Sequence, residues 1–538
     1  MKTFSVVAIL FCGPGSVLAQ IIKVPQDYST IQTAIDSAQT GDTVLVAEGT
    51  YVENLKIAKK ITVASLYVLD NDTSHISKTI IDGGSPSHPD SASVILILPG
   101  TDSTTVIKGF TIQNGKGTLA QFPLPEFGNP SYRSGGGILI IANGGATISS
   151  NIIKNNSCQA SGEIHTFAAG IAIIPDSKFT IAPNSWIIEN NSILNNNTDA
   201  DSWAVGGGLF LIGPGRCMNN IIMNNSSSGP KGEAAGVLLT DVPGLANQHI
   251  ELSNNLITHN VTSWWAGGIG LGADGGGHVT MTLKNNIITN NSAGSFGGAL
   301  GVNGGNYSLI NNTIAGNSGP EALFVESSAG PLTFRLMNNI IWNPDAGSEF
   351  NEVTDDVTSA YNCVRRGLEG ISNIDTDPLF VVNDSLYRLS SSSPCISAGV
   401  MMASVGDTIL TAPVWDYLGM TRPRPSNTQP DMGAIEYDME TSVKEKGEGI
   451  PKEFVLEQNY PNPLNPTTTI SYQLTKNSYV TLKIYDLVGR EVETLVIGEK
   501  PAGKYEVSWY AGGFSSGLYF YRLKSENFVQ TKKLILLR

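Results

Sequence analysis

The segment MNNIIMNN (218–225) decides the fold, because an Asn pair, three apolar residues and a second Asn pair recur along the chain. Six further segments repeat this form with small changes: SSNIIKNN (149–156), ENNSILNNN (189–197), SNNLITHN (253–260), KNNIITNN (284–291), INNTIAGN (310–317) and MNNIIWN (337–343). Of the 44 Asn residues in the 538-residue chain, 29 lie between positions 151 and 350. A local excess of this kind indicates an internal repeat.

A second signal, a step of small residues leading into an apolar strand, alternates with the first. It occurs as GGGILI (135–140), AAGIAI (168–173), GGGLFL (206–211), AAGVLL (234–239), AGGIGL (266–271) and GGALGV (297–302). The last Gly of each step lies 33, 38, 28, 32 and 30 residues after the one before it. Strands this short cannot fold alone, so successive repeats must stack and bury one another.

This spacing, with short strands and no helices between them, predicts an all-β chain that winds as a right-handed parallel β-helix. Asn at one corner of successive coils is expected to adopt the left-handed turn conformation and to hydrogen-bond through its amide to the coils above and below. Gly at another corner allows a tight bend. A β-propeller, the alternative, would need four strands in every 40 to 50 residues or so and its own blade motifs.

Composition and charge exclude several classes of protein. Hydrophobic residues make up 41% of the chain and charged residues 15%, which argues against disorder and against a long coiled coil. Lys and Arg number 33 against 47 Asp and Glu, giving a net charge of −14. Binding to nucleic acid or to anionic lipid is therefore disfavoured.

The N-terminal segment MKTFSVVAILFCGPGSVLAQ (1–20) has the form of a secretory signal peptide. Lys2 supplies the positive charge, residues 6–11 the apolar core, and Val17-Leu18-Ala19 a small-residue cleavage site. No later apolar run is long enough to span a bilayer. We therefore expect residues 1–19 to be removed and the protein to be exported without a transmembrane helix.

The segment that follows is expected to cap the coils. Ile31, Ala34, Ile35 and Ala38 fall on one face of a short helix that Gly41 should end. A helix that covers the open end of the stack protects an edge that would otherwise template aggregation.

Cysteine use after the signal peptide is sparse. Cys158, Cys217, Cys363 and Cys395 are widely spaced, and no CxxC motif indicates zinc. A Cys158–Cys217 disulfide and buried free thiols are the two alternatives.

The segment PQDYSTIQTAIDSAQTGDTVLVAEGTYVENLKI (25–57) resembles the N-terminal cap and first coil of the pectate-lyase-like β-helix superfamily. The resemblance extends over residues 21 to about 345. It implies the fold, whereas the superfamily includes lyases, hydrolases, esterases, epimerases and non-enzymes, so it does not identify the chemistry.

Residues 374–437 resemble a small module called choice-of-anchor Q, which follows β-helices and precedes sorting tails. The matching segments are Asp377-Pro378-Leu379-Phe380, Tyr387-Arg388-Leu389, residues 393–399, Asp416 to Gly419 with Arg422, and residues 431–436. The resemblance implies no activity, and the carboxylates of this module are expected to be structural.

The tail after the charged linker at 438–452 alternates strands with turn signals, as in a small β-sandwich. It resembles the type A C-terminal sorting domain of type IX secretion through Tyr460-Pro461-Asn462-Pro463, Tyr485-Asp486 with Gly489-Arg490, Gly517-Leu518-Tyr519 and Lys532-Lys533. The resemblance implies engagement of the type IX machinery and a location outside, or on the outer-membrane surface of, a Gram-negative bacterium. The expected domains are thus 1–19 signal, 20–345 β-helix, 346–437 β-helix end and module, 438–452 linker, and 453–538 Ig-like sorting sandwich.

Residues just before each Gly step should stack as a column at one corner, and they combine aromatic with ionisable side chains. Aromatic faces repeated at the rung spacing of about 4.8 Å, with carboxylates between them, would suit a polysaccharide lying along the coil axis. The predicted contacts are Tyr132, Phe167, Trp203, Trp264, Trp265 and Phe296. The alternative is that Phe167, Trp203 and Phe296 only cover the outside of a sheet beneath a loop.

Catalytic candidates lie in the same column: Arg133, Glu163, His165, Asp199, Asp201, Lys231 and Glu233. Asp199 or Asp201 with Glu233 could act as the acid and base of a glycoside hydrolase. A polysaccharide lyase would instead use Arg133, His165 or Lys231 as the base, with Ca²⁺ to neutralise a uronate. The Asp-Asp and Gly-His-Gly signatures of polygalacturonases are absent, and both Asp274 and His278 are expected to be turn residues.

Three classes of function therefore remain open: a polysaccharide-degrading enzyme, a non-catalytic glycan-binding or adhesive protein, and a structural protein of the envelope or matrix. The sequence gives no metal site and no oligomeric state.

Overall fold

The computed structural model describes residues 19–121, 131–141, 144–174, 186–241, 248–272, 279–351, 357–437, 453–460, 462, 464, 467–486, 490–511, 514, 517–525 and 528–536. Residues 1–18 of the expected signal peptide, the linker at 438–452, Asp274 and His278 lie outside these ranges.

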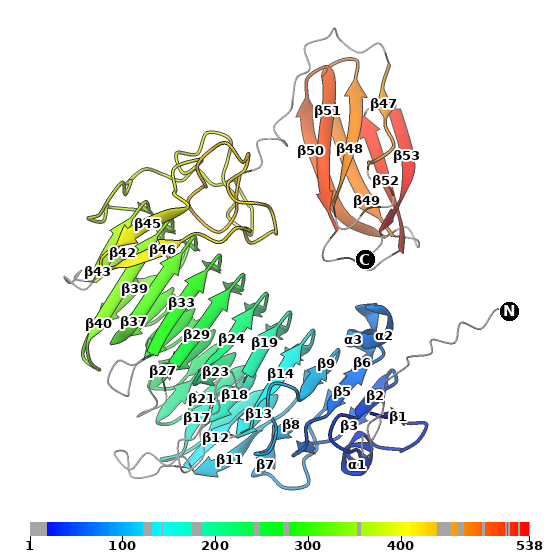
Figure 1. Ribbon diagram of the computed structural model, residues 1–538, viewed down its shortest axis with the longest axis vertical. Helices are drawn as coiled ribbons and strands as arrows, with labels where there is room; N and C mark the ends of the chain where they lie inside the picture. The colour runs from blue at the N-terminus through cyan, green and yellow to red at the C-terminus, as the bar shows by residue number, and fades with distance from the viewer. Residues whose placement is uncertain are drawn as a thin grey trace, which may run out of the picture.

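The chain winds as a right-handed parallel β-helix, as predicted, with three long parallel sheets that we call A, B and C (Figure 1). Sheet A has twelve strands: β1 (Ile21–Val24), β2 (Thr43–Val46), β5 (Thr62–Ser65), β9 (Val106–Lys108), β14 (Ala146–Ser149), β19 (Trp186–Glu189), β24 (Gly215–Met218), β29 (Gln248–Ser253), β33 (Val279–Lys284), β37 (Gly305–Ile310), β40 (Leu332–Met337) and β43 (Val357–Ala360). Sheet B has eleven: β3 (Gly49–Val52), β6 (Thr79–Asp82), β10 (Thr111–Gln113), β15 (Ile152–Lys154), β20 (Ser192–Leu194), β25 (Ile221–Met223), β30 (Leu256–Thr258), β34 (Ile287–Thr289), β38 (Thr313–Ala315), β41 (Ile340–Trp342) and β44 (Cys363–Val364). Sheet C has ten: β4 (Leu55–Ile57), β8 (Ile95–Ile97), β13 (Ile138–Ile141), β18 (Ile171–Ile174), β23 (Leu209–Ile212), β28 (Val237–Thr240), β32 (Ile269–Gly272), β36 (Leu300–Asn303), β39 (Gly319–Glu326) and β42 (Ala346–Phe350).

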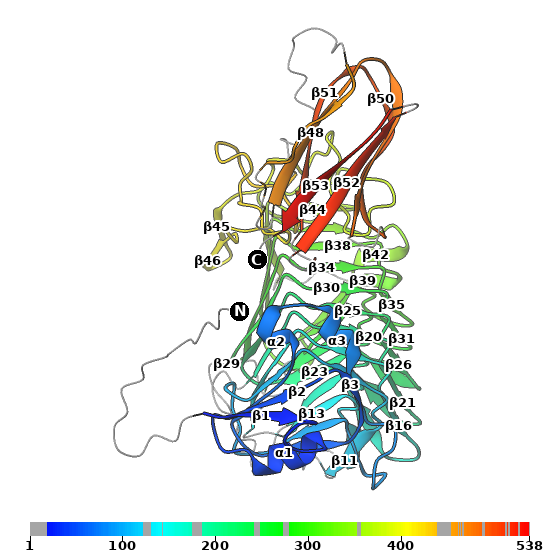
Figure 2. The same cartoon turned by 90° about the vertical axis from the view of Figure 1, so that its right-hand side faces the viewer.

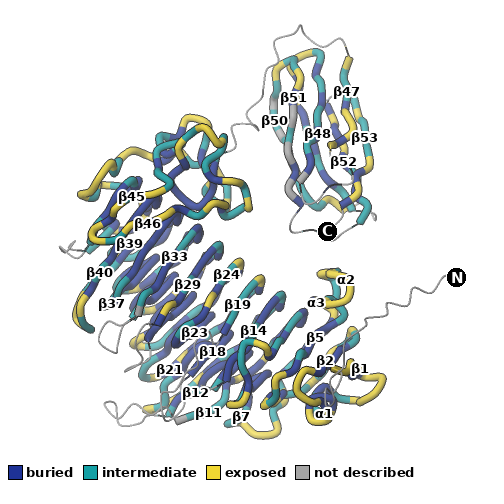
Figure 3. The backbone as a smooth tube through the Cα atoms, in the orientation of Figure 1, coloured by how far each residue is buried: buried dark blue, intermediate teal, exposed yellow. Residues whose placement is uncertain are grey.

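The interior is built from columns of identical side chains in register. On sheet B, one Ile from each of eight successive strands points inward and is fully buried: Ile112, Ile153, Ile193, Ile222, Ile257, Ile288, Ile314 and Ile341. Each coil buries little surface alone, so these stacked side chains supply the hydrophobic stabilisation that a single short strand lacks. The dark strands of Figure 3 show this buried interior.

The two Asn of each pair have different roles. The predicted left-handed conformation and the predicted amide hydrogen bonds are both present, but on different Asn residues, whereas the prediction gave both to the same Asn. The first Asn is left-handed, with φ between 51° and 58° at ten such positions from Asn155 to Asn338. The second Asn points inward and donates its amide to the carboxamide oxygen of the Asn one coil further on. Between sheets A and B this ladder runs through Asn151, Asn191, Asn220, Asn255, Asn286, Asn312, Asn339, Asn362 and Asn373.

A parallel ladder follows each sheet B strand, through Asn156, Asn196, Asn225, Asn260, Asn291, Asn317 and Asn343. Its end is closed by Glu349, whose carboxylate accepts hydrogen bonds from Asn343 N (2.9 Å) and Asn343 Nδ2 (2.8 Å). The two ladders satisfy the buried polar groups at both corners of the coil.

The small-residue steps make the third corner. Their first residue is left-handed, including Ala168, Ala234 and Ala266 with φ of 35°, 46° and 60°. Their last Gly lies against the neighbouring coil, because a Cβ on Gly170 would lie 2.3 Å from the carbonyl oxygen of Gly208. The absence of a side chain there is what permits adjacent coils to approach.

Two further sheets, D and E, form a flap between sheets B and C. Sheet D contains β7 (Ser91–Ala92), β11 (Gly117–Gln121), β12 (Ser131–Ser134), β17 (His165–Phe167), β22 (Trp203–Val205) and β27 (Lys231–Glu233). Sheet E contains β16 (Ser157–Ala160), β21 (Asn197–Ala200), β26 (Ser226–Ser228), β31 (Val261–Thr262) and β35 (Ser292–Ala293). In a typical coil the chain leaves sheet B, forms one strand of E, turns into one strand of D and then enters sheet C; Figure 2 shows the strands of E stacked at one side.

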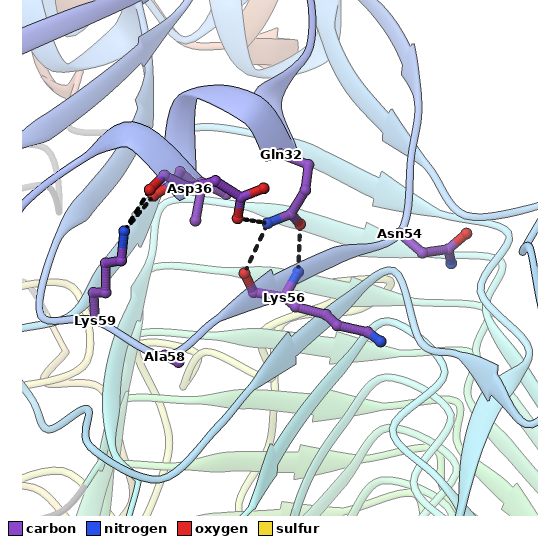
Figure 4. Close-up of a pocket in the computed structure, with 7 residues that line it drawn as sticks. Gln32, Asp36, Asn54, Lys56, Ala58 and Lys59 are labelled. Atoms are coloured by element: carbon purple, nitrogen blue, oxygen red, sulfur yellow. Dashed lines mark hydrogen bonds between the residues drawn. The ribbon is translucent and has the colours of Figure 1, made fainter.

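The N-terminal helix α1 (Ile31–Ser37) covers the first coil, as expected, with Ile31, Ala34, Ile35 and Ala38 buried. It ends at Ser37, four residues before Gly41, because Lys59 Nζ already satisfies the last carbonyls at 2.7 to 3.2 Å. The side-chain amide of Gln32 bonds to both the N–H and the C=O of Lys56, which closes the exposed edge of β4 (Figure 4). Two short helices that the sequence analysis did not predict, α2 (Tyr67–Asp70) and α3 (Ser74–Lys78), follow β5.

The module after the last coil contains one hairpin, β45 (Met402–Val405) with β46 (Thr408–Thr411), and lies on the corner between sheets A and B. Left-handed Asn residues of that corner hold it, since Asn285, Asn311 and Asn338 donate to its backbone carbonyls. The buried carboxylates of Asp416 and Glu436 are structural in this geometry. Asp416 accepts hydrogen bonds from backbone N–H groups of Met420 and Glu436, while Glu436 pairs with Arg422 at 2.7 Å.

The four cysteines among the described residues, Cys158, Cys217, Cys363 and Cys395, are free and buried. Cys158 lies on sheet E and Cys217 on sheet A, so the disulfide considered for this pair is not formed.

The tail forms a sandwich of two antiparallel sheets. One contains β47 (Val455–Leu456), β48 (Thr467–Leu474) and β51 (Gly503–Tyr510); the other contains β49 (Ser478–Tyr485), β50 (Glu491–Lys500), β52 (Gly517–Ser525) and β53 (Phe528–Leu536). Leu482, Tyr521 and Trp509 are at the centre of its own hydrophobic core.

Candidate functional site

The predicted site column lies on sheet D and on the turns that join sheets E and D. Tyr132 is in register with His165, and Trp203 with Lys231. A second row of the same sheet continues through Phe167, Val205 and Glu233 to Trp265 and Phe296. The residues of the predicted column that belong to these two rows therefore lie in register on successive coils, whereas Asp199 lies on sheet E.

Three of the six predicted aromatic contacts are interior residues. Tyr132, Phe167 and Trp265 are 1%, 6% and 9% exposed. Phe167 stacks on Tyr132 at 4.5 Å and on Phe210 of sheet C at 4.6 Å. They fill the space between sheet D and the outer face of sheet C. These three side chains therefore cover a sheet, and a ligand has no access to their ring faces.

Trp265 shows how close this packing is. A Cβ on Gly270 would lie 2.6 Å from its ring, and one on Gly301 would lie 2.2 Å from it. The two glycines of sheet C therefore leave the space that the indole occupies. This contact of Trp265 with one glycine of its own coil and one of the next coil could not be recognised from spacing alone.

The other aromatic side chains are half-buried, so part of each ring is exposed to solvent. We call His165, Trp203, Lys231, Trp264 and Phe296 the rim. The His165 and Trp203 rings meet edge to face at 5.8 Å, and Trp264 and Phe296 meet at 6.3 Å. The indole N–H of Trp203 is buried without a hydrogen-bond partner, an arrangement that costs stability.

His165 is the ionisable group of the rim whose hydrogen bonds fix its tautomer. Its Nδ1 lies 2.8 Å from Ser202 Oγ, and that hydroxyl donates its hydrogen to Ile164 O at 3.2 Å. Because the hydroxyl has a single hydrogen, it accepts from Nδ1–H, and Nε2 is left as the acceptor nitrogen. Burial, assisted by the positive charge of Lys231, lowers the pKa of His165, so the ring is neutral near pH 7.

The predicted carboxylates do not form a pair. Asp199 is exposed on the outer face of sheet E, where its Oδ1 lies 2.9 Å from Ser228 Oγ. Glu233 is 9% exposed and shares the face of sheet D that carries Val205, which turns toward sheet C. Asp199 and Glu233 therefore lie on different sheets, one exposed and the other buried, an arrangement that does not favour the predicted pairing.

Asp201 and Glu163 remain on the turns beside the rim, and both are exposed. Asp201 Oδ2 accepts a hydrogen bond from Gly162 N at 3.0 Å, which joins two successive turns. Glu233 is 9% exposed, so it is not available to Asp201 as an exposed partner either.

Arg133 is occupied by structural contacts. Its guanidinium donates to Pro89 O and Gly117 O and pairs with Asp90 at 2.9 Å. It fixes the loop before β7 and is not a candidate base. Lys231, by contrast, is exposed.

Within the described ranges, no group of three or more His, Cys, Asp or Glu side chains is arranged to hold a metal ion. No helix among the described residues is both long and apolar enough to cross a membrane.

A feature that the sequence analysis missed is a cleft where the last coils meet the module. It has a volume of about 350 Å³ and is lined by Trp342, Asp345, Asp377, Phe380 and Tyr387 among others. Its walls come from segments more than thirty residues apart, so no local motif could have indicated it. A second hollow, of about 440 Å³, lies beside α1, where Gln32, Asp36 and Lys59 are engaged in the capping contacts described above (Figure 4).

Comparison with known families matches residues 458–537 to the secretion system C-terminal sorting domain. This indicates type IX secretion, so the protein is secreted or surface-attached in a Gram-negative bacterium. No curated protein matches the chain significantly. Among solved structures, a mutant of the PL6 family alginate lyase AlyGC is similar with a TM-score of 0.30 and 12% identity, over 70% of this chain and 57% of that enzyme's chain.

Proposed function

We propose that this protein is exported through type IX secretion, after removal of residues 1–19, and binds a polysaccharide along the rim. The observation that carries the proposal is the row of half-buried aromatic rings at successive coils, with exposed charged groups beside it. Aromatic faces bury the apolar face of a sugar ring, and Lys231, Asp201 and Glu163 offer hydrogen bonds to its hydroxyl groups. The β-helix holds these groups at a fixed spacing, so little entropy is lost on binding.

The test is retention of the full chain by an array of insoluble polysaccharides. Trp264→Ala and Lys231→Ala should each lower the affinity about tenfold, equivalent to about 1.4 kcal/mol. Lys23→Ala, an exposed lysine on β1, is the matched control and should bind like the parent. Equal retention of all four proteins would refute the rim as the binding surface.

A second function, cleavage of the bound polysaccharide by β-elimination, is favoured by the geometry of His165. In this reaction Nε2 takes the C5 proton of a uronate residue, the electron pair forms the C4–C5 double bond, and the O4 substituent leaves and is protonated. Lys231 is the nearby positive group that would stabilise the charge on the uronate carboxylate.

His165→Gln tests this second function, because Gln keeps a hydrogen-bonding side chain but has no nitrogen that can act as a base near pH 7. It should abolish the appearance of unsaturated products while retention changes less than threefold. Retention with no unsaturated products from the parent would leave a binding protein and refute the lyase activity. Release of reducing ends without unsaturation would instead indicate a hydrolase.

A further inference from the structure

The cleft between the last coils and the module, which we call the junction cleft, is separate from the rim. Trp342 ends β41 and Asp345 lies in the turn after it, whereas Asp377, Phe380 and Tyr387 belong to the module. The cleft volume of about 350 Å³ falls at the lower end of the roughly 300–1,000 Å³ usual for small-molecule sites. That space fits one or two sugar rings.

The aromatic wall of the junction cleft is held rigidly. Phe380 and Tyr387 meet edge to face at 5.1 Å. The Tyr387 hydroxyl donates to Asn290 Oδ1 at 2.9 Å. The hydroxyl also lies against Gly316, because a Cβ added to that glycine would be 2.2 Å from the hydroxyl oxygen. A salt bridge between Asp384 and Arg388 at 2.9 Å closes the turn that carries Tyr387.

The polar groups that line the cleft are acidic. Asp345 and Asp377 are both exposed. Asp377 Oδ1 accepts from Leu379 N at 2.8 Å, which leaves its other oxygen available, and Asp345 accepts no hydrogen bond from the described part of the chain. Burial, with a contribution from the charge of Asp345, raises the pKa of Tyr387, which places that carboxylate near the ring. No Lys or Arg lines the cleft.

We infer that the junction cleft is a second carbohydrate site and that it takes an uncharged sugar residue. The rings of Trp342 and Phe380 supply faces for the apolar side of a pyranose, and each carboxylate can accept hydrogen bonds from a pair of adjacent hydroxyls. Two carboxylates without a lining cation repel a uronate.

The experiment measures binding of the full chain to neutral hexasaccharides of glucose, mannose, galactose and xylose by calorimetry. Oligogalacturonate and glucosamine oligomers serve as anionic and cationic probes. At least one neutral probe should bind, and Asp345→Asn and Phe380→Ala should each weaken it tenfold or more. Glu369→Gln, an exposed acid outside the cleft, should bind like the parent. The conservative Asp345→Asn change keeps the shape of an exposed side chain, so loss of folding does not account for its effect.

Several outcomes would overturn the inference: no neutral probe binds, the cleft variants bind like the parent, or only the glucosamine oligomers bind. Failure here is distinguishable from failure at the rim. Trp264→Ala and Lys231→Ala should leave binding of the neutral hexasaccharide unchanged, whereas the cleft variants should retain the rim's affinity for insoluble polysaccharide.

Discussion

Asn225 in the second ladder is the position where the structure makes its strongest prediction about stability. Its Nδ2 donates to Ile193 O and to Asn260 Oδ1, and its Oδ1 accepts from Asn196 N and Asn196 Nδ2, all at 3.0 Å. The residue is 1% exposed. Asn225→Ala removes all four hydrogen bonds but leaves their partners in place: the two N–H donors of Asn196 and the oxygen acceptors of Ile193 and Asn260.

The four losses are not equal. In the variant, Asn196 Nδ2 still donates to Ile153 O, and Asn260 Oδ1 still accepts from the backbone N–H of residue 225. The Asn196 N–H has no second acceptor among the described contacts, and an unsatisfied buried donor costs about 1–3 kcal/mol. With about 0.5–1.5 kcal/mol for each of the other three bonds, the expected loss of stability is about 3–5 kcal/mol after partial relaxation.

Native-state hydrogen exchange of the Asn196 amide is the direct assay, with urea unfolding as a second readout. A loss of 3 kcal/mol lowers protection more than a hundredfold, since each 1.4 kcal/mol is a factor of ten. Asn224→Gly is the matched control: Asn224 is exposed at the same corner with φ of 56°, a conformation that Gly adopts freely. The reasoning is refuted if Asn225→Ala costs no more than Asn224→Gly.

Three further predictions follow from other parts of the molecule. Gly301→Ala should destabilise the β-helix by about 1–3 kcal/mol, because its Cβ would lie 2.2 Å from the Trp265 ring, whereas Gly272→Ala, with its nearest atom at 3.8 Å, should be neutral in the same urea titration. Burial, and then the charge of Glu436, raises the pKa of Asp431 from 3.8 to about 7. Between these values the folded chain holds a proton that the unfolded chain has lost, so stability should fall as pH rises from 4 to 7, by up to about 1.4 kcal/mol per pH unit. Unfolding midpoints that stay flat or rise over this range would contradict the assignment. Deletion of residues 453–538 should leave the protein inside the outer membrane, as cell fractionation would detect; continued appearance outside the cell would show that the sorting domain is dispensable.

The repeat made the fold predictable. Asn and Gly recur at corners where only their backbone or hydrogen-bonding properties fit, so their spacing alone indicated stacked coils. The sequence pattern did not separate the two roles of Asn, because each pair supplies one left-handed residue and one ladder residue only in the folded coil. The short helices α2 and α3 were not predicted because they lie in a single insertion that no other coil repeats.

The site was less predictable because residues two apart on sheet D share a face but differ in burial, as half-buried His165 and buried Phe167 do. Spacing placed Phe167, Glu233 and Trp265 beside His165 and Trp203, but whether a side chain on sheet D turns inward depends on the packing against sheet C. Phe210 and Gly301, which lie in other strands, determine that packing. The junction cleft had no sequence signal at all, since its walls come together only when the module lies on the coils.

The central claim is that the rim binds polysaccharide. The most direct measurement is the retention of the full chain on an array of insoluble polysaccharides, compared with a variant carrying both Trp264→Ala and Lys231→Ala. Retention of the parent by at least one polysaccharide, reduced tenfold or more in the double variant with an unchanged circular dichroism spectrum, is the predicted result. Failure of the parent to be retained by any polysaccharide, or equal retention of the two proteins, would contradict the claim and favour a structural role for the exported β-helix.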